Sequence, residues 1–321
     1  MRNVSFSLFL AAVAGSAVVA CSATPENRFA NDASTPGEST GDGGQVLGSG
    51  GGDEDTACKK MDLVFVIDNS GSMGEEQTNL KANFPKFVTV LNNFKTKSGD
   101  PVDYRLAVTT TGVSAHLETI AGAADQVGDD GAFRKTSGMT HAWLERSDAK
   151  LTTLFQTIAA VGTDGPSYEM PLESSRLALR EQLKKSNTGF LRDDALLGVV
   201  FLTDEEDCST ASRTIGSVSN PISSMGKCTG SQEATSKYVS FFDTLKQGRE
   251  RWATAVVAGP GPGSCSSTFG TAAEAPRLKA FVSEVGATAV FSSICDGDLA
   301  GALTKALSTF DVACQNFAQA H

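Results

Sequence analysis

The 321-residue sequence is poor in histidine and lacks the common motifs of hydrolases and zinc proteins. Its three histidines lie far apart, and no group of cysteines and histidines has the spacing of a zinc site. Residues 58–321 contain no G-x-S-x-G elbow between a strand and a helix and no H-E-x-x-H motif. The sequence therefore argues against serine-hydrolase and zinc-protease chemistry, and we expect no enzymatic activity.

The sequence also has fewer basic than acidic residues. The chain has 27 lysines and arginines against 37 aspartates and glutamates, for a formal charge of −10. A nucleic-acid surface needs clustered basic residues, so this balance argues against binding to nucleic acid. It also disfavours tight adhesion to anionic lipid headgroups and is compatible with cation binding.

Long apolar runs are scarce, and none after the first twenty residues is long enough to span a bilayer. Arg2 followed by the small apolar segment Phe6–Ala20 predicts a secretory signal peptide over residues 1–20. Its end, Val18-Val19-Ala20-Cys21, resembles the lipobox of bacterial lipoproteins, which implies that Cys21 becomes a lipidated first residue. An ordinary signal peptide is the alternative. By resemblance to lipoprotein sorting rules, Ser22 favours the outer membrane or cell surface over the inner membrane.

Residues 21–57 contain almost no large apolar side chain and are rich in Gly, Ser, Thr, Asp and Pro. Such a segment cannot bury a core, so it is predicted to be a disordered tether. Residues 58–321 are then predicted to form a single folded domain in the cell envelope.

The most informative stretch is an apolar run, Leu63–Ile67, that leads directly into D-N-S-G-S-M. Five consecutive apolar residues indicate a strand buried on both faces. Asp68, Ser70 and Ser72 follow it and offer three oxygen ligands of the kind that Mg²⁺, Ca²⁺ or Mn²⁺ prefers. The alternative is that Asp68 or Ser72 only caps the next helix.

Strands and helices are predicted to alternate over the remaining chain, which indicates a doubly wound α/β domain with a mostly parallel central sheet flanked by helices. The further strands are expected at Tyr104–Thr111, Leu196–Thr203, Trp252–Ala258 and Ala287–Ile294. Helices are expected at Glu75–Phe94, Ala149–Val161, Glu169 or Pro171 to Lys185, around Tyr238–Leu245, Ala275–Val285 and Leu299–Phe310. The region 112–147 shows no clear pattern beyond two short candidate edge strands.

A second buried strand ends in a carboxylate, Asp204. In open α/β sheets, ligands bind beyond the carboxyl ends of the strands where the connection direction reverses. We therefore expect Asp204 to join Asp68 and the two serines at a divalent-cation site. Mg²⁺ is preferred because hydroxyls and few carboxylates leave room for the waters it retains. The acidic run Glu205-Glu206-Asp207 is expected to be a solvated loop, and a second metal site is the alternative.

The combination of D-N-S-G-S-M after one apolar strand and F-L-T-D on a later one is similar to the von Willebrand factor A (vWA) domain. The resemblance spans about residues 58–314. It implies a doubly wound sheet and a metal-ion-dependent adhesion site (MIDAS), with Asp68, Ser70, Ser72 and Asp204 matching the family's ligands. It also implies a protein ligand that reaches the metal through a carboxylate.

One position departs from the family. The family has a threonine ligand in the loop that here reads G-T-D-G-P-S-Y-E-M-P. Glu169 is the preferred substitute and Ser167 the alternative. A carboxylate at this position would neutralise more of the cation and occupy the place of a partner's carboxylate. Glu169 has a purely structural alternative as well, which is interaction with the helix dipole.

Three functions follow from these patterns. The first is a binding or adhesion module for an unidentified protein. The second is a structural surface protein whose metal only stabilises the fold. The third is a metal-dependent hydrolase: Asp68-Asn69-Ser70 resembles the nucleophile motif of haloacid-dehalogenase-type phosphatases, but Ser70 stands where those enzymes need an aspartate.

Six cysteines besides Cys21 allow fifteen disulfide pairings: Cys58, Cys208, Cys228, Cys265, Cys295 and Cys314. In the predicted sheet, four of them follow the carboxyl ends of strands. The other two lie at the opposite end, before the first strand and after the last helix. Because bridged Cα atoms lie within about 7 Å, each pair must share an end. The expected pairs are Cys58–Cys314, Cys208–Cys228 and Cys265–Cys295.

If Cys21 is lipidated, its acyl chains should anchor the protein to the membrane. Cys21→Ser should release the protein from the membrane fraction, because each buried acyl methylene contributes about 0.8 kcal/mol to anchoring. Fractionation and mass spectrometry of the N-terminal peptide would test this. Continued membrane association of the variant, with no lipid mass on the wild-type peptide, would contradict it.

Overall fold

The computed structural model describes residues 58–96, 99–119, 124–218, 228, 232–268 and 270–317. The predicted signal peptide, Cys21 and the tether lie outside the described residues and stay predictions. Residues 51–321 form one compact unit. In the part of the chain that is described, no helix has the length and apolar character needed to cross a membrane.

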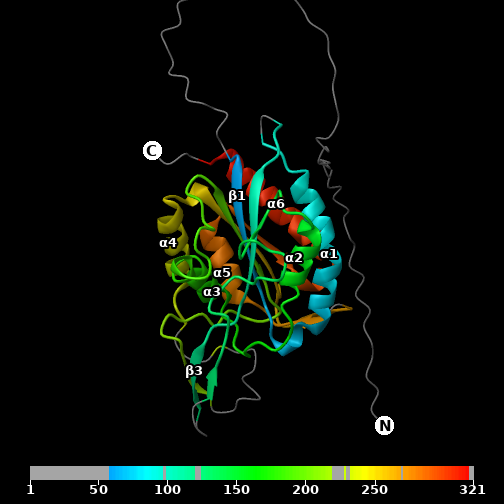
Figure 1. Cartoon of the computed structure of the whole chain (residues 1–321). Coiled ribbons are helices and arrows are strands. Elements are labelled where there is room, and N and C mark those ends of the chain that lie inside the picture. Colours follow the sequence, from blue (N-terminus) through cyan, green and yellow to red (C-terminus); the bar gives the residue numbers. More distant parts are fainter. Residues whose placement is uncertain are drawn as a thin grey trace, which may run out of the picture. The chain divides into compact units, whose positions relative to one another are not determined.

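A six-stranded sheet forms the centre of the domain, in the order β11-β8-β6-β1-β2-β5 (Figure 1). Its strands are β1 (Lys60–Ile67), β2 (Asp103–Thr110), β5 (Leu144–Glu145), β6 (Leu196–Leu202), β8 (Trp252–Ala258) and β11 (Ala289–Ser293). All neighbours are parallel except β5, which runs antiparallel to β2. The chain builds outward from β1 in both directions, so the connection reverses between β1 and β6. The doubly wound α/β fold predicted from the sequence is confirmed.

Helices cover both faces of this sheet. The helices α1 (Gly74–Asn92), α2 (Leu151–Ala159) and α6 (Leu299–Gln315) pack on one face, and α3 (Pro171–Ala178), α4 (Thr235–Lys246) and α5 (Pro276–Val285) on the other. The apolar run Leu63–Ile67 of β1 is explained by burial on both faces of the sheet. Leu63, Phe65 and Ile67 enter the first hydrophobic cluster, whereas Val64 and Val66 enter the second.

The loops at the carboxyl end of the sheet contain structure that the sequence pattern did not reveal. A second sheet consists of β4 (Ala124–Gln126), β3 (Ala115–Thr119) and β7 (Thr214–Val218), and β9 (Cys265–Ser267) pairs with β10 (Gly270–Ala272). Strand β3 pairs with β7 from a distant part of the chain, so no local pattern marks it. Short 3₁₀ turns lie at Gly71–Met73, Gln182–Lys184, Arg249–Arg251 and Ile294–Asp296.

One helix is shorter than expected. The sequence predicts that α3 continues to Lys185, but it ends at Ala178 and is followed by turns and the 3₁₀ segment Gln182–Lys184. The buried Asn187 accounts for the change of direction, since its side-chain amide donates to the carbonyl oxygens of Ala178 (3.0 Å) and Gly131 (2.9 Å). A longer helix would carry the chain away from these partners.

Three disulfides join the pairs that the topological argument gives. Their Cα–Cα distances are 5.0 Å for Cys58–Cys314, 4.9 Å for Cys208–Cys228 and 6.1 Å for Cys265–Cys295. The first fastens the start of β1 to the end of α6, at the amino ends of the strands. The other two brace the loops at the carboxyl end.

Loop length predicts how much each disulfide stabilises the fold. Replacing Cys58 and Cys314 by serine should cost about 5 kcal/mol, because the bridge closes the longest loop of the unfolded chain, whereas the same change at Cys208 and Cys228 should cost about 3 kcal/mol. Denaturant unfolding of the two double variants would measure the difference. Equal losses, or a larger loss for the Cys208–Cys228 pair, would contradict the prediction.

Candidate metal centre

Asp68 is held in place by the strand that precedes it. Its backbone N–H donates to the Leu202 carbonyl oxygen (2.8 Å), so the register between β1 and β6 continues one residue past the end of β1. The fully buried carboxylate accepts from the Ser70 N–H (2.7 Å) through Oδ1 and from the Thr203 hydroxyl (2.5 Å) through Oδ2. Asp68 therefore lies fixed at the point where the sheet connection reverses.

The two serines of the motif lie together next to this carboxylate. The Ser70 and Ser72 hydroxyl oxygens are 3.0 Å apart at the start of the 3₁₀ turn that leads into α1. Ser70 is buried and Ser72 is exposed, so the pair extends from the interior to the surface. The nearby Ser72 hydroxyl also tends to lower the pKa of the Asp204 carboxylate.

Asp204 approaches the same point from the end of β6. Only 2% of this residue is exposed, and its Oδ1 has no hydrogen-bond partner. Burial, followed by the negative charge of Asp68, raises the pKa of Asp204 to about 8. Asp68, Ser70, Ser72 and Asp204 thus lie close together at the carboxyl end of the sheet.

Glu169 and Ser167 are the two candidates for the ligand position at which the family has a threonine. Of these, Glu169 and not Ser167 faces the cluster. Ser167 is exposed, whereas Glu169 is fully buried and hydrogen-bonds the Thr111 hydroxyl through Oε2. Its other oxygen, Oε1, has no partner. Burial and the charge of Asp68 raise the pKa of Glu169 well above its ordinary value.

A glycine brings the loop that carries Glu169 against the Asp68 turn. The Gly165 N–H donates to the Asn69 carbonyl oxygen (2.7 Å). A Cβ at Gly165 would lie 2.3 Å from the Asn69 side-chain oxygen, so a larger residue here would require the Asn69 side chain to move. On the far side of the loop, the Cys208 N–H donates to the Glu169 carbonyl oxygen (2.7 Å).

The structure adds four residues that the sequence analysis did not select: Thr111, Thr203, Glu76 and Glu205. The two threonines bind the candidate ligands Glu169 and Asp68 directly. The charges of Glu76 and Glu205 raise the pKa of Asp204. Burial and the charge of Asp68 in turn raise the pKa of Glu205 to about 7. In the sequence, Thr203 and Glu205 were marked only by their positions on either side of Asp204.

The expectation that Glu205-Glu206-Asp207 is a solvated loop is wrong. Asp207 is fully buried and forms an ion pair with Arg277 (3.0 Å), and Glu206 accepts from the Arg277 N–H (3.0 Å) in the first turn of α5. The two carboxylates fasten this loop to α5, because carboxylates interact favourably with helix amino termini.

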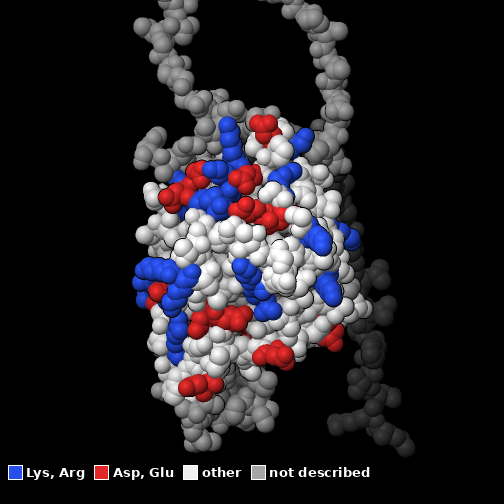
Figure 2. All heavy atoms as spheres, viewed as in Figure 1, with Lys and Arg blue, Asp and Glu red and all other residues white. Residues whose placement is uncertain are grey.

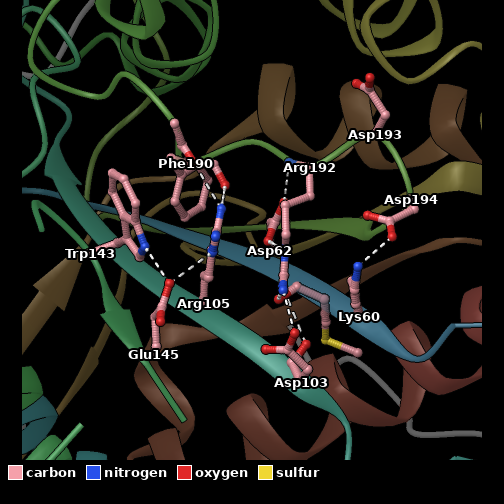
Figure 3. A network of polar contacts seen from close by, with 12 residues as sticks. Lys60, Asp62, Asp103, Arg105, Trp143, Glu145, Phe190, Arg192, Asp193 and Asp194 are labelled. Carbon is pink, nitrogen blue, oxygen red and sulfur yellow. Dashed lines mark hydrogen bonds and ion pairs between the residues drawn. The ribbon is translucent and has the colours of Figure 1, made fainter. Parts of the chain in front are cut away.

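The buried carboxylates of the described residues fall into two groups. Three have an arginine partner: Asp62 with Arg192, Glu173 with Arg176, and Asp207 with Arg277. Figure 3 shows the first pair, at the opposite end of β1 from the candidate site. Four others form no ion pair within the described part of the chain: Asp68, Glu76, Glu169 and Asp204.

All four unpaired carboxylates belong to the candidate site. On the face shown in Figure 2, by contrast, acidic and basic side chains are interspersed. Three of the four carry a buried oxygen without a hydrogen-bond partner, namely Glu76 Oε2, Glu169 Oε1 and Asp204 Oδ1. Since burying an unpaired charge is costly, this arrangement fits a site completed by a cation.

The donor set suits a hard divalent cation. It offers carboxylate and hydroxyl oxygens and no sulfur or imidazole, which is the chemistry of Mg²⁺, Mn²⁺ and Ca²⁺. Within the described ranges, no three Asp, Glu, His or Cys side chains form a ready-made metal cluster. A cation held here would therefore need hydroxyl ligands such as those of Ser70 and Ser72 in addition to carboxylates.

The chain has no match to a protein-family model or to a curated protein sequence. Among solved structures, proximal thread matrix protein 1 from the mussel byssus, with a zinc-occupied MIDAS motif, is 14% identical at a TM-score of 0.39, covering 81% of this chain and 47% of that one. The manganese-loaded TRAP protein of Plasmodium vivax is 13% identical at a TM-score of 0.35, and the match covers 78% of this chain and 74% of that one.

A third similar structure is the pilus adhesin SpaC of Lactobacillus rhamnosus GG, 12% identical at a TM-score of 0.38, covering 80% of this chain and 31% of that one. The chain thus spans about half the length of the mussel protein and a third of the adhesin. At these TM-scores the likenesses carry no weight for function, which is inferred below from the residues of this chain.

The raised pKa values predict how stability depends on pH. Burial and the charge of Asp68 raise the pKa of Asp204 to about 8 and the pKa of Glu205 to about 7, above their values in the unfolded chain. The folded state then holds more protons, so its stability should fall as pH rises from about 5 to about 8. Thermal unfolding in EDTA across this range would measure the trend.

Asp204→Asn provides the control for this prediction. It should reduce the slope by up to about 1.4 kcal/mol per pH unit, the contribution of one proton. Stability that rises with pH over the same range in EDTA, or a slope that the substitution leaves unchanged, would contradict the assignment.

Proposed function

We propose that this chain is a cell-envelope protein that presents a vWA-like domain as a non-enzymatic module for binding another protein. Asp68, Ser70, Ser72, Asp204 and Glu169 would hold one divalent cation, with Mg²⁺ preferred and Ca²⁺ or Mn²⁺ as alternatives. The observation that carries the proposal is the group of four buried carboxylates without an arginine, gathered where the sheet connection reverses. When bound, the cation supplies a coordination position for an oxygen atom of the partner.

The exposure of Ser72 supports a role in binding and not only in stability. A purely structural ion needs no opening to the surface, whereas this ligand set runs from the buried Asp68 to an exposed hydroxyl. The residues of the chain have distinct tasks in this arrangement. Thr203 orients the Asp68 carboxylate, Thr111 orients Glu169, and the serines complete the ligand set.

The placement of the site also agrees with a lipid anchor at Cys21 and an outer-membrane or cell-surface location. The tether would enter the domain at Cys58, next to the start of β1, whereas Asp68 follows its end. Eight residues of strand separate the two by about 26 Å. The tether would therefore join the domain at the end of β1 that is remote from the site.

Calorimetry and capture on the same protein test this function. Residues 51–321, which contain all the described hydrophobic clusters and all three disulfides, should bind one Mg²⁺. Asp68→Ala should abolish the binding and Ser72→Ala should weaken it by about tenfold, since each removes a ligand. Ser240→Ala, at an exposed serine of α4, is the matched control and should bind as the wild type does.

Capture from an envelope extract then separates binding from a structural role. The immobilised wild type should retain a partner in Mg²⁺ and lose it in EDTA, and Asp68→Ala should retain none. If EDTA lowers the melting temperature but leaves capture intact, the ion is structural. Unchanged Mg²⁺ affinity in Asp68→Ala would overturn the site itself.

A further inference from the structure

A groove lies beside the candidate metal centre, between the first turns of α1 and the β9–β10 hairpin. It has a volume of about 510 Å³ and is lined by Gly74, Glu75, Thr78, Asn79, Ala82 and Thr268. The groove begins two residues after Ser72, so it adjoins the exposed end of the ligand set. Among the described lining residues, Glu75 is the only charged one, and the others are small or neutral.

Glu76, next to Glu75 in α1, makes this region more acidic. Its carboxylate packs against the backbone of Gly270, where a Cβ would lie 1.7 Å from Oε1. The residue is only 3% exposed, and its Oε2 has no hydrogen-bond partner. Glu76 is also within electrostatic range of Asp68 and Asp204, so it links the groove to the metal centre.

Formal charge indicates what kind of partner group this region attracts. One divalent cation brings two positive charges, whereas Asp68, Asp204 and Glu169 alone bring three negative charges when ionised. Glu75, Glu76 and Glu205 add to the excess. No described lysine, arginine or histidine forms an ion pair with any of these six residues. The loaded site therefore remains negative and repels a carboxylate of the partner.

We propose that the groove between α1 and the β9–β10 hairpin receives a lysine or arginine side chain of the partner protein, next to the metal. This inference rests on the proposed function, because it assigns the chemistry of the partner at the same end of the sheet. The cationic head group lies against Glu75, and its aliphatic stem runs along the helix in the direction of Thr78 and Ala82. Glu169 takes the place at the metal that an acidic ligand would otherwise occupy.

Small probes test the charge preference directly. The ¹⁵N-labelled protein, residues 51–321 in Mg²⁺, is titrated with N-acetyl-lysine amide, N-acetyl-arginine amide or N-acetyl-glutamate amide while amide shifts are recorded by NMR. The two basic probes should shift the Gly74, Thr78 and Thr268 amides, and the acidic probe should leave them unchanged. Glu75→Gln should weaken the response about two- to fivefold, as expected for one exposed ion pair, and Glu75→Lys should remove it.

A control variant and a metal-binding measurement separate the groove assignment from the proposed metal site. Asp311→Asn, on α6 at the other end of the domain, should leave the titration unchanged. A stronger response to the acidic probe, or no response to the basic probes at these amides, overturns the inference. Calorimetry on the same sample reports on the metal: if Mg²⁺ does not bind but the basic probes do, the proposed metal site fails and the groove assignment stands.

Discussion

Strand β1 is the element on which both the fold and the candidate site depend. It is hydrogen-bonded in parallel register to β2 on one side and to β6 on the other, and its side chains alternate between the two main hydrophobic clusters. Such a strand has no free edge and no free face. The residue that follows it, Asp68, is therefore placed by the whole core, and the serines after it are placed by the turn into α1.

Strand β1 and the residue that follows it supply two buried carboxylates, and the cost of burial is met differently at each. Asp62, in its first half, accepts from the side chain (2.8 Å) and the backbone N–H (2.7 Å) of Arg192 (Figure 3). Asp68, at its far end, meets only hydroxyl and backbone donors and further carboxylates. An uncompensated buried charge costs several kcal/mol, so the fold gives up stability at the end where the site lies. A cation that binds there would compensate the buried negative charge and restore this stability, so that binding is coupled to folding.

Sequence reasoning succeeded where the determining interactions are local or topological. An apolar run that ends in D-x-S-x-S marks β1 and three of the candidate ligands, and the alternation of strands with helices gives the sheet and the cysteine pairs. It missed Thr111 and Glu76, because their importance comes from contacts with Glu169 and Gly270 made only in the folded chain. It misjudged Asp207 for the same reason, since the partner that makes its burial tolerable, Arg277, is 70 residues away.

The arrangement also has a mechanical consequence. If the proposed anchor at Cys21 and the proposed partner at the metal centre act together, tension between them would enter β1 at Cys58 and leave it at Asp68. The load then runs parallel to the strand, so the hydrogen bonds to β2 and β6 resist it together in shear and are not broken one at a time. The Cys58–Cys314 disulfide passes part of the load to α6, at the point where β1 would otherwise begin to peel from the sheet. The strand that positions the site is therefore also the one best placed to bear force through it.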